Sequence, residues 1–187
     1  TLNTEMLQIN DMIAQVIRIV RGRADENRLK LIFQEVEAKA IEADPRAVKQ
    51  VLLNLMTNAI KFTPEGGAVS VVVEPKTAGI IIRVSDTGIG ISKEDIERLA
   101  QPFEQIDSQH SRKHEGTGLG LAITSEILEA MNGKIEVKSE LGKGSTFSVW
   151  LNNVSYQQIE KQDEKIEKNM KSLEEKINKL AGKDLID

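Results

Sequence analysis

A polar stripe on a predicted helix is the first feature of the sequence that could do chemistry. Asp44 followed by Pro45 favours a helix start, because the carboxylate can cap free amides and proline needs no amide at the first helical position. The helix is expected to run to about residue 62, with apolar residues on one face and Asn54, Asn58 and Lys61 on a different face. Core packing does not account for this polar stripe.

Two glycine clusters are the second such feature. One contains Gly88 and Gly90 after Asp86, and the other runs from Gly116 to Gly120. Glycine is needed where the backbone passes close to a ligand or adopts positive φ, although two tight turns would also use it. The second cluster opens a predicted helix, so its amides would point at an incoming anion. This indicates a phosphate cradle. It lacks the Gly-Lys-Ser/Thr ending of the Walker motif and the βαβ setting of a dinucleotide site.

The elements that must position these residues follow from hydrophobic periodicity. Helices are expected at about 9–23, 45–62, 92–100 and 118–131, and strands at 29–36, 40–43, 68–74, 80–85, 134–138 and 145–151. The stretch 101–115 has neither period and is predicted to be a mobile loop. Strands clustered between helices of this kind predict an α/β two-layer sandwich, a sheet covered on one face by helices.

Length and composition set further limits. With 187 residues, one domain plus an extension is expected. The formal charge of −4 gives no overall positive field for gripping nucleic acid, and no nucleic acid partner is predicted. The absence of cysteine and of any apolar run long enough to span a bilayer favours a cytoplasmic location, with membrane anchoring left to a longer parent protein.

The last segment, 153–187, is rich in Lys and Glu. Apolar residues recur there at heptad spacing, with Ile159, Ile166 and Leu173 in one row. This spacing predicts a helical tail, and it fits a short coiled coil, which would allow a dimer, as well as a solvated single helix or linker. Both interpretations stay open, and the tail carries no candidate site residue.

Five short motifs, in order, make the resemblance to a known family specific. The segment from Gln50 to Pro64 looks like the N box of sensor histidine kinases, and Asp86-Thr-Gly88-Ile-Gly90 resembles their G1 box. Gln101-Pro-Phe103 resembles the F box, Gly116-Thr-Gly118-Leu-Gly120 the G2 box, and Gly142-Lys-Gly144-Ser-Thr146-Phe the closing element. The resemblance implies a Bergerat fold over 9–152, with about five strands in a mixed sheet under about three helices.

The same resemblance implies a site for ATP and Mg²⁺. Asn58 is similar to the amide that contributes an oxygen to Mg²⁺, a hard ion that prefers oxygen ligands, and Lys61 would meet phosphate charge. Asp86 looks like the carboxylate that accepts a hydrogen bond from the adenine amino group, and Thr146 would support the same adenine edge directly or through water. Further nucleotide contacts are expected from Phe62, Gly88, Gly90, Phe103, Gly116, Thr117, Gly118, Leu119, Gly120 and Leu121.

The stretch between Phe103 and Gly116 corresponds to the ATP lid of the family. Arg112 and Lys113 are placed to approach the terminal phosphates, although a charge run is usually just solvated. Another large group of histidine kinases has arginine two residues after the F-box phenylalanine. Here Gln105 stands there, so the basic role is assigned to Arg112.

One position separates transfer from hydrolysis. Hydrolytic members of the superfamily have a glutamate one turn before the metal-binding asparagine, whereas this chain has Asn54, and an amide is no general base. The resemblance therefore implies an ATP:protein-histidine phosphotransferase whose acceptor histidine lies on a separate dimerisation domain. Residues 1–8 are expected to be a linker or the end of that domain's helix. His110 and His114 lie in the lid and are not expected to be the acceptor.

A response regulator would receive the phosphoryl group through the parent kinase. Two alternatives remain at this stage. One is a hydrolytic ATPase of the same superfamily, and the other is a degenerate kinase domain that acts as an interaction module.

Overall fold

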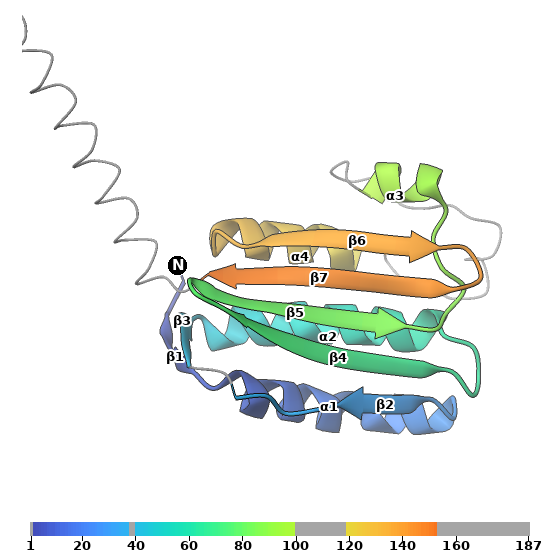
Figure 1. Cartoon of the computed structure of the whole chain (residues 1–187), viewed down its shortest axis with the longest axis horizontal. Helices are drawn as coiled ribbons and strands as arrows, with labels where there is room; N and C mark the ends of the chain where they lie inside the picture. Colours follow the sequence, from blue (N-terminus) through green and yellow to red (C-terminus); the bar gives the residue numbers. More distant parts are fainter. Residues whose placement is uncertain (1, 38–39, 100–118, 153–187) are drawn as a thin grey trace, which may run out of the picture. The chain divides into compact units, whose positions relative to one another are not determined.

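Alternating apolar residues build a mixed sheet of five strands. The structure, a computed structural model, describes residues 2–37, 40–99 and 119–152. The strand order is β2 (Lys30–Phe33), β4 (Ala68–Lys76), β5 (Gly79–Asp86), β7 (Gly144–Asn152) and β6 (Lys134–Glu140). β2 runs parallel to β4, and the remaining neighbours are antiparallel (Figure 1).

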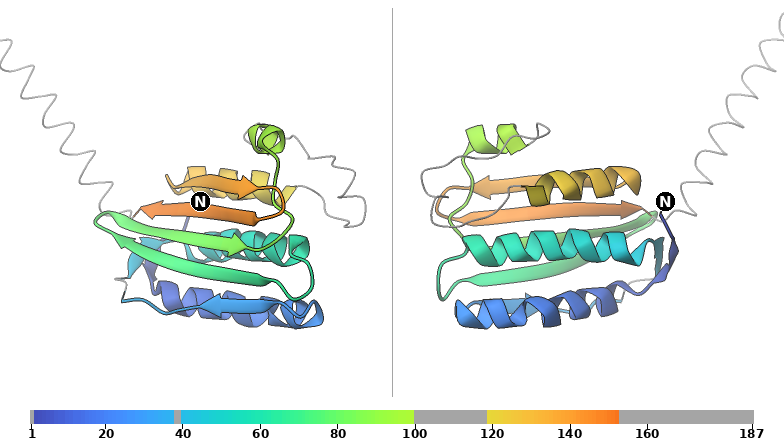
Figure 2. Two further views of the ribbon diagram at one scale, coloured as in Figure 1. Left: turned by 45° about the vertical axis from the view of Figure 1, so that its right-hand side comes forward. Right: turned by 180° about the vertical axis from the view of Figure 1, so that it is seen from behind.

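Three helices cover one face of this sheet. They are α1 (Ile9–Glu26), α2 (Pro45–Phe62) and α4 (Leu119–Ala130), and Figure 2 shows all three on the same side. The short helix α3 (Lys93–Leu99) contacts β6 at the edge of the sheet instead. The predicted two-layer sandwich with about five strands and three covering helices is confirmed.

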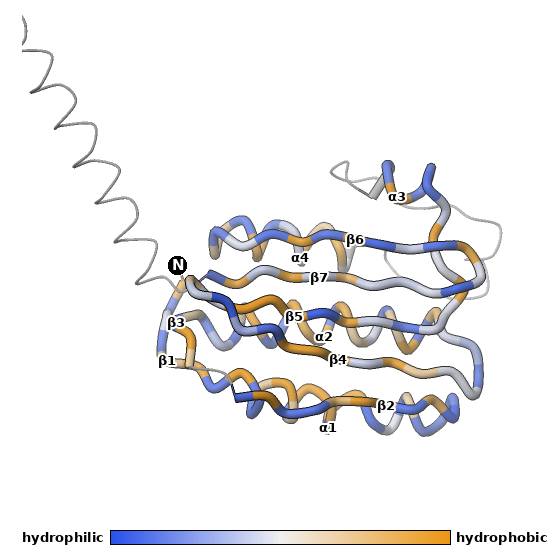
Figure 3. The backbone as a smooth tube through the Cα atoms, viewed as in Figure 1, coloured by the Kyte–Doolittle hydropathy of each residue, from blue (hydrophilic) through white to orange (hydrophobic). Residues whose placement is uncertain are grey.

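The core lies between the sheet and the three helices. Val71, Ile82 and Val84 come from the sheet, and Leu52 and Leu55 from α2; each is at most 2% exposed. Alternate residues of the same strands, such as Val72 at 48% exposed, lie on the open face. Figure 3 shows that hydrophobic residues also occur along the strands of this sheet. The period of two along a strand places neighbouring residues of β5 and β7 on opposite faces of the sheet.

The N-terminal residues differ from the expectation. Glu5–Leu7 form strand β1, which pairs antiparallel with β3 (Ile41–Ala43) in a separate two-stranded sheet. The helical interpretation of residues 1–8 is therefore wrong for β1. Three residues are too few to show a strand period, so this strand is specified by its partner.

Other boundaries shift by a few residues. α1 continues past Gly22 to Glu26, and the strand expected at 29–36 ends at Phe33. The predicted lid and the tail at 153–187 lie outside the described residues and stay predictions. Among the described helices, none has the length and apolar character needed to cross a membrane.

Asp44 anchors the start of the helix that carries the polar stripe. Its Oδ1 accepts hydrogen bonds from the amides of Arg46 and Ala47 at 2.9 and 3.1 Å, and Pro45 occupies the first turn as predicted. Its Oδ2 accepts the amide of Asn3 at 2.8 Å, which holds the segment before β1. These bonds, led by the one from Asn3, hold the pKa of Asp44 below its usual range.

We expect Asp44→Ala to lower the free energy of unfolding by about 1–2 kcal/mol, because the helix loses its cap. Asp44→Asn keeps an acceptor and should lose less. A carboxyl with a depressed pKa stabilises the fold above its unfolded pKa, so the difference between wild type and Asp44→Ala should shrink below about pH 4. Urea unfolding at pH 7 and pH 3 measures this. An equal difference at both pH values would contradict the assignment.

Candidate functional site

The polar stripe of α2 faces the beginning of α4. The Nδ2 group of Asn54 donates to the carbonyl of Gly120 at 3.1 Å and to Oγ1 of Thr124 at 3.2 Å. Its Oδ1 accepts from Nε2 of Gln50 at 2.8 Å. Both hydrogens of this amide therefore hold α4 against α2, and its oxygen is bonded within α2. Asn54 acts in this arrangement as a structural tie.

Asn58 lies one helical turn further along the same face. A Cβ added to Gly120 would lie 3.9 Å from Nδ2 of Asn58, so the amide sits beside the first turn of α4. Asn58 is half-buried, and its side-chain amide has no hydrogen bond to any other described residue. Its amide group is thus available to a ligand at the junction of the two helices.

Lys61 and Phe62 end α2 next to this junction. Nζ of Lys61 lies 5.0 Å from the centroid of the Phe62 ring. Phe62 is half-buried, and its ring is not among the residues of the hydrophobic core. Its carbonyl accepts the amide of Ile89 at 3.1 Å, which ties the loop after β5 to the end of α2.

Asp86 is the last residue of β5 and is held by two backbone amides. Its Oδ1 accepts from the amide of Gly88 at 2.8 Å and from that of Ser145 at 3.3 Å. Oδ2 has no recorded partner in the described part of the chain. Burial raises the pKa of Asp86, and the two amides oppose this rise without cancelling it.

The loop after Asp86 leaves no space for a side chain at its two glycines. A Cβ on Gly88 would lie 2.4 Å from the carbonyl oxygen of Phe62 and 2.7 Å from Oδ1 of Asp86. Gly90 has φ of +70°, and a Cβ there would lie 2.0 Å from the carbonyl oxygen of Glu140. The first glycine cluster is therefore required by close backbone approach and positive φ.

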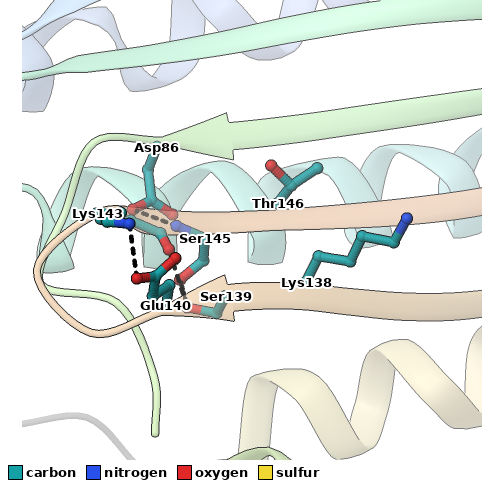
Figure 4. A pocket seen from close by; sticks show the side chains of 8 residues that line it. Asp86, Lys138, Ser139, Glu140, Lys143, Ser145 and Thr146 are labelled. Atoms are coloured by element: carbon teal, nitrogen blue, oxygen red, sulfur yellow. Dashed lines mark hydrogen bonds and ion pairs between the residues drawn. The ribbon is translucent and has the colours of Figure 1, made fainter. Parts of the chain in front are cut away.

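The turn between β6 and β7 completes the wall around Asp86. Gly142 donates its amide to the carbonyl of Ile89 at 2.8 Å, and the amide of Ile91 donates to Oγ of Ser139 at 2.7 Å. These bonds join the loop after β5 to the turn. A shallow polar hollow of about 300 Å³ lies at this turn, lined by Lys138, Lys143 and Thr146 among others (Figure 4).

The register of β7 places Ser145 and Thr146 on different faces of the sheet. Asp86 lies directly opposite Ser145 in the sheet, on the face that carries Val84 and Phe147, whereas Thr146 lies opposite Ser85 on the open face. Its hydroxyl is 2.9 Å from that of Ser85. Figure 4 shows Ser145, not Thr146, against the Asp86 carboxylate. Ser145 therefore shares the face of Asp86 and Thr146 does not, because neighbours in a strand point to opposite faces. The contact of Thr146 with the nucleotide stays a prediction.

The remaining predicted residues fall into three groups. Leu119 begins α4, and Gly120 sits at its contact with α2. Leu121 is half-buried and packs against the hydrophobic core. The others lie outside the described residues, and their roles stay predictions: Phe103, Arg112, Lys113, Gly116, Thr117 and Gly118.

A family model matches residues 43–155, which include α2, the loop after β5, α4 and the β6–β7 hairpin. Its description is histidine kinase-, DNA gyrase B- and HSP90-like ATPase. The chain belongs to this family. The predicted recognition is thereby confirmed over the segment that carries every described site residue.

Relatives and solved structures place the chain among histidine kinases of this family. It is 49% identical over 154 residues to the non-motile and phage-resistance protein of Caulobacter vibrioides, covering 80% of this chain and 18% of that protein. It is 41% identical over 132 residues to the circadian input-output histidine kinase CikA of Synechococcus elongatus, covering 70% and 18% respectively. The chain thus spans about a fifth of the length of the curated relatives it matches.

The fold is that of a histidine kinase catalytic domain. The catalytic domain of histidine kinase ThkA superposes with a TM-score of 0.70 at 28% identity, covering 81% of this chain and 97% of that domain. Full-length ShkA in complex with AMPPNP gives a TM-score of 0.69 at 31% identity, covering 81% of this chain and 32% of ShkA.

Sequence reasoning missed three residues of the site, Ser139, Ser145 and Thr124. Each acts through a hydrogen bond to a residue far away in the chain or through its backbone amide. The strand period shows that Ser145 and Thr146 point to opposite faces. Only the register of β7 against β5 shows which of them shares the face of Asp86.

We expect Asp86→Asn to raise the melting temperature at pH 7.5 by about 2 °C or more. A carboxyl whose pKa is raised by folding destabilises the fold once it is ionised, and asparagine removes that charge while keeping an acceptor for both amides. The gain should shrink as the pH falls through the raised pKa, because the wild-type carboxyl then becomes neutral. Calorimetric melts between pH 7.5 and pH 4 test this, and a gain that is independent of pH would contradict it.

Proposed function

We propose that this domain binds Mg-ATP where α2, α4 and the loop after β5 meet, and positions the γ-phosphoryl group for transfer to a histidine on a separate dimerisation domain. The supporting observation is that Asn58, Gly120 and the Phe62–Gly88 contact bring the N-box helix, the G2 helix and the G1 loop together around one site. The ShkA structure, solved with AMPPNP, has the same fold.

The adenine end of the proposed site is formed by Asp86 and Ser145. The backbone holds Oδ1 of Asp86, so Oδ2 is left to accept a hydrogen bond from the exocyclic amino group of adenine. A buried carboxylate without such a partner would be unfavourable, which is consistent with the raised pKa of Asp86. The ring of Phe62 lies outside the hydrophobic core and is proposed to lie against the nucleotide.

The phosphate end of the proposed site is formed by the helix junction. The amide oxygen of Asn58 suits Mg²⁺, and Lys61 supplies positive charge at the end of α2. Bound Mg²⁺ would neutralise part of the phosphate charge. The amides at the start of α4 would face the same anion. Arg112, Lys113 and the glycines from Gly116 to Gly118 are proposed to complete this end.

The hydrogen bonds of Asn54 favour phosphoryl transfer over ATP hydrolysis in the proposed site. A hydrolytic enzyme needs a base next to the attacking water, and every polar group of the Asn54 amide is already engaged with Gln50, Gly120 or Thr124. The described site residues provide acceptors and positive charge without such a base. The acceptor histidine and a response regulator are proposed partners in the longer parent protein, in which this domain would work on the cytoplasmic side.

We expect AMPPNP to bind the wild-type domain and Asp86→Asn to weaken its binding roughly 10- to 100-fold, because a hydrogen bond to a charged acceptor is lost. Titration calorimetry measures this. Asp11→Asn is the matched control, since it removes the same charge from an exposed position on α1 and should leave the affinity unchanged. Absence of binding to wild type, with or without Mg²⁺, would instead favour an interaction module.

We expect Asn58→Ala to abolish the dependence of AMPPNP affinity on Mg²⁺, because the proposed metal ligand is removed. With labelled ATP and the parent's dimerisation domain added in trans, wild type should produce acid-labile phosphohistidine, and Asn58→Ala should slow transfer about 100-fold or more. Rapid ATP hydrolysis without transfer would favour the hydrolytic alternative. Unchanged Mg²⁺ dependence in Asn58→Ala would remove Asn58 as the ligand.

A further inference from the structure

Ser139, on β6, is a hydrogen-bond hub behind the proposed adenine site. Its Oγ donates to the carbonyl of Gly144 at 2.9 Å and accepts the amide of Ile91 at 2.7 Å. It also lies 2.8 Å from Oγ of Ser145. A hydroxyl has one hydrogen and two lone pairs. A carbonyl only accepts and an amide N–H only donates, so when all three contacts of Ser139 are hydrogen bonds at once, the hydrogen between the two serines belongs to Ser145.

This assignment fixes the polarity of Ser145. Its only hydroxyl hydrogen points back at Ser139, so its lone pairs are the groups left for anything that approaches beside Asp86. Its backbone amide is engaged with Oδ1 of Asp86. Asp86 in its ionised form also offers only an acceptor, Oδ2. The pair formed by Asp86 and Ser145 therefore presents acceptors alone.

We propose that Ser139 is a positioning residue that sets base specificity, because it holds Ser145 as a hydrogen-bond acceptor and so makes the site select a purine with an amino group at position 6. This inference rests on the proposed function. An adenine amino group donates to such acceptors, whereas the 6-oxo group of guanine or hypoxanthine would meet lone pairs with no hydrogen between them. A buried acceptor without a donor carries a desolvation penalty that disfavours the 6-oxo purine.

Loss of Ser139 changes what Ser145 can do. In Ser139→Ala the Ser145 hydroxyl rotates freely and can donate its hydrogen to a 6-oxo group. The orphaned amide of Ile91 would loosen the loop and weaken both ligands alike. Discrimination between ligands therefore separates the proposed role from a purely structural one.

The test measures the affinities of ADP and IDP by calorimetry with Mg²⁺. ADP has an amino group at position 6 of the purine, whereas IDP has an oxo group there and a proton on N1. Wild type should prefer ADP, and Ser139→Ala should lower the ADP:IDP affinity ratio about fivefold, the effect of one net hydrogen bond. Ser139→Thr keeps the hydroxyl and should keep the ratio. Ser85→Ala removes a hydroxyl from the equivalent pair with Thr146 on the open face, and it should also keep the ratio.

A double-mutant cycle makes the result decisive. Since Ser139 acts through Ser145, adding Ser139→Ala to Ser145→Ala should not lower the ratio further. The proposal would be overturned if Ser139→Ala weakened ADP and IDP binding by the same factor. It would also be overturned if Ser145→Ala kept the wild-type ADP:IDP affinity ratio, and this second test remains valid even if Ser139→Ala fails to fold. Failure of wild type to bind ADP at all would overturn the proposed function, and this inference with it, and is distinguished by that first titration.

Discussion

The structure around the site depends on one half-buried carboxylate, that of Asp86. Asp86 ends β5 where burial raises its pKa, and two amides from different segments hold one of its oxygens in place. The backbone that provides these two amides must pass very close to Asp86. This is why glycine occurs at Gly88 and at Gly144, where an added Cβ would lie 2.0 Å from the carbonyl oxygen of Asp86. The close approach of the backbone to the Asp86 carboxylate therefore explains the glycines at these two positions.

Helix α2 serves the fold and the site with different faces. One face is buried against the sheet and the other holds α4 through Asn54, while Asn58 stays free of partners among the described residues. Asp44 caps the helix at the opposite end from Lys61. Stability and ligand contact are thus assigned to different residues on a single rigid element, which keeps the site in place without using its ligand-binding groups for packing.

Three separate segments form one wall behind the adenine position. The loop after β5 is bonded to α2 through Phe62 and to the β6–β7 turn through Ile89 and Ile91. Any change in the turn would therefore reach Asp86 through Ser139 and Ser145. The chain shares its fold with the family of histidine kinase-, DNA gyrase B- and HSP90-like ATPases, and we propose that the side chains on this wall decide which base the site accepts.

Much of the molecule could be predicted from sequence because its signals are local. Capping at Asp44, the apolar period of α2 and the glycine spacing each act within a few residues, so the helices, the sheet and the polar stripe were predictable. β1 was not, because three residues show no period and only β3 specifies the strand. Likewise, the sequence by itself determined that a serine and a threonine follow Gly144. Only the tertiary structure decided that Ser145 joins Asp86, since strand register depends on partners distant in the chain.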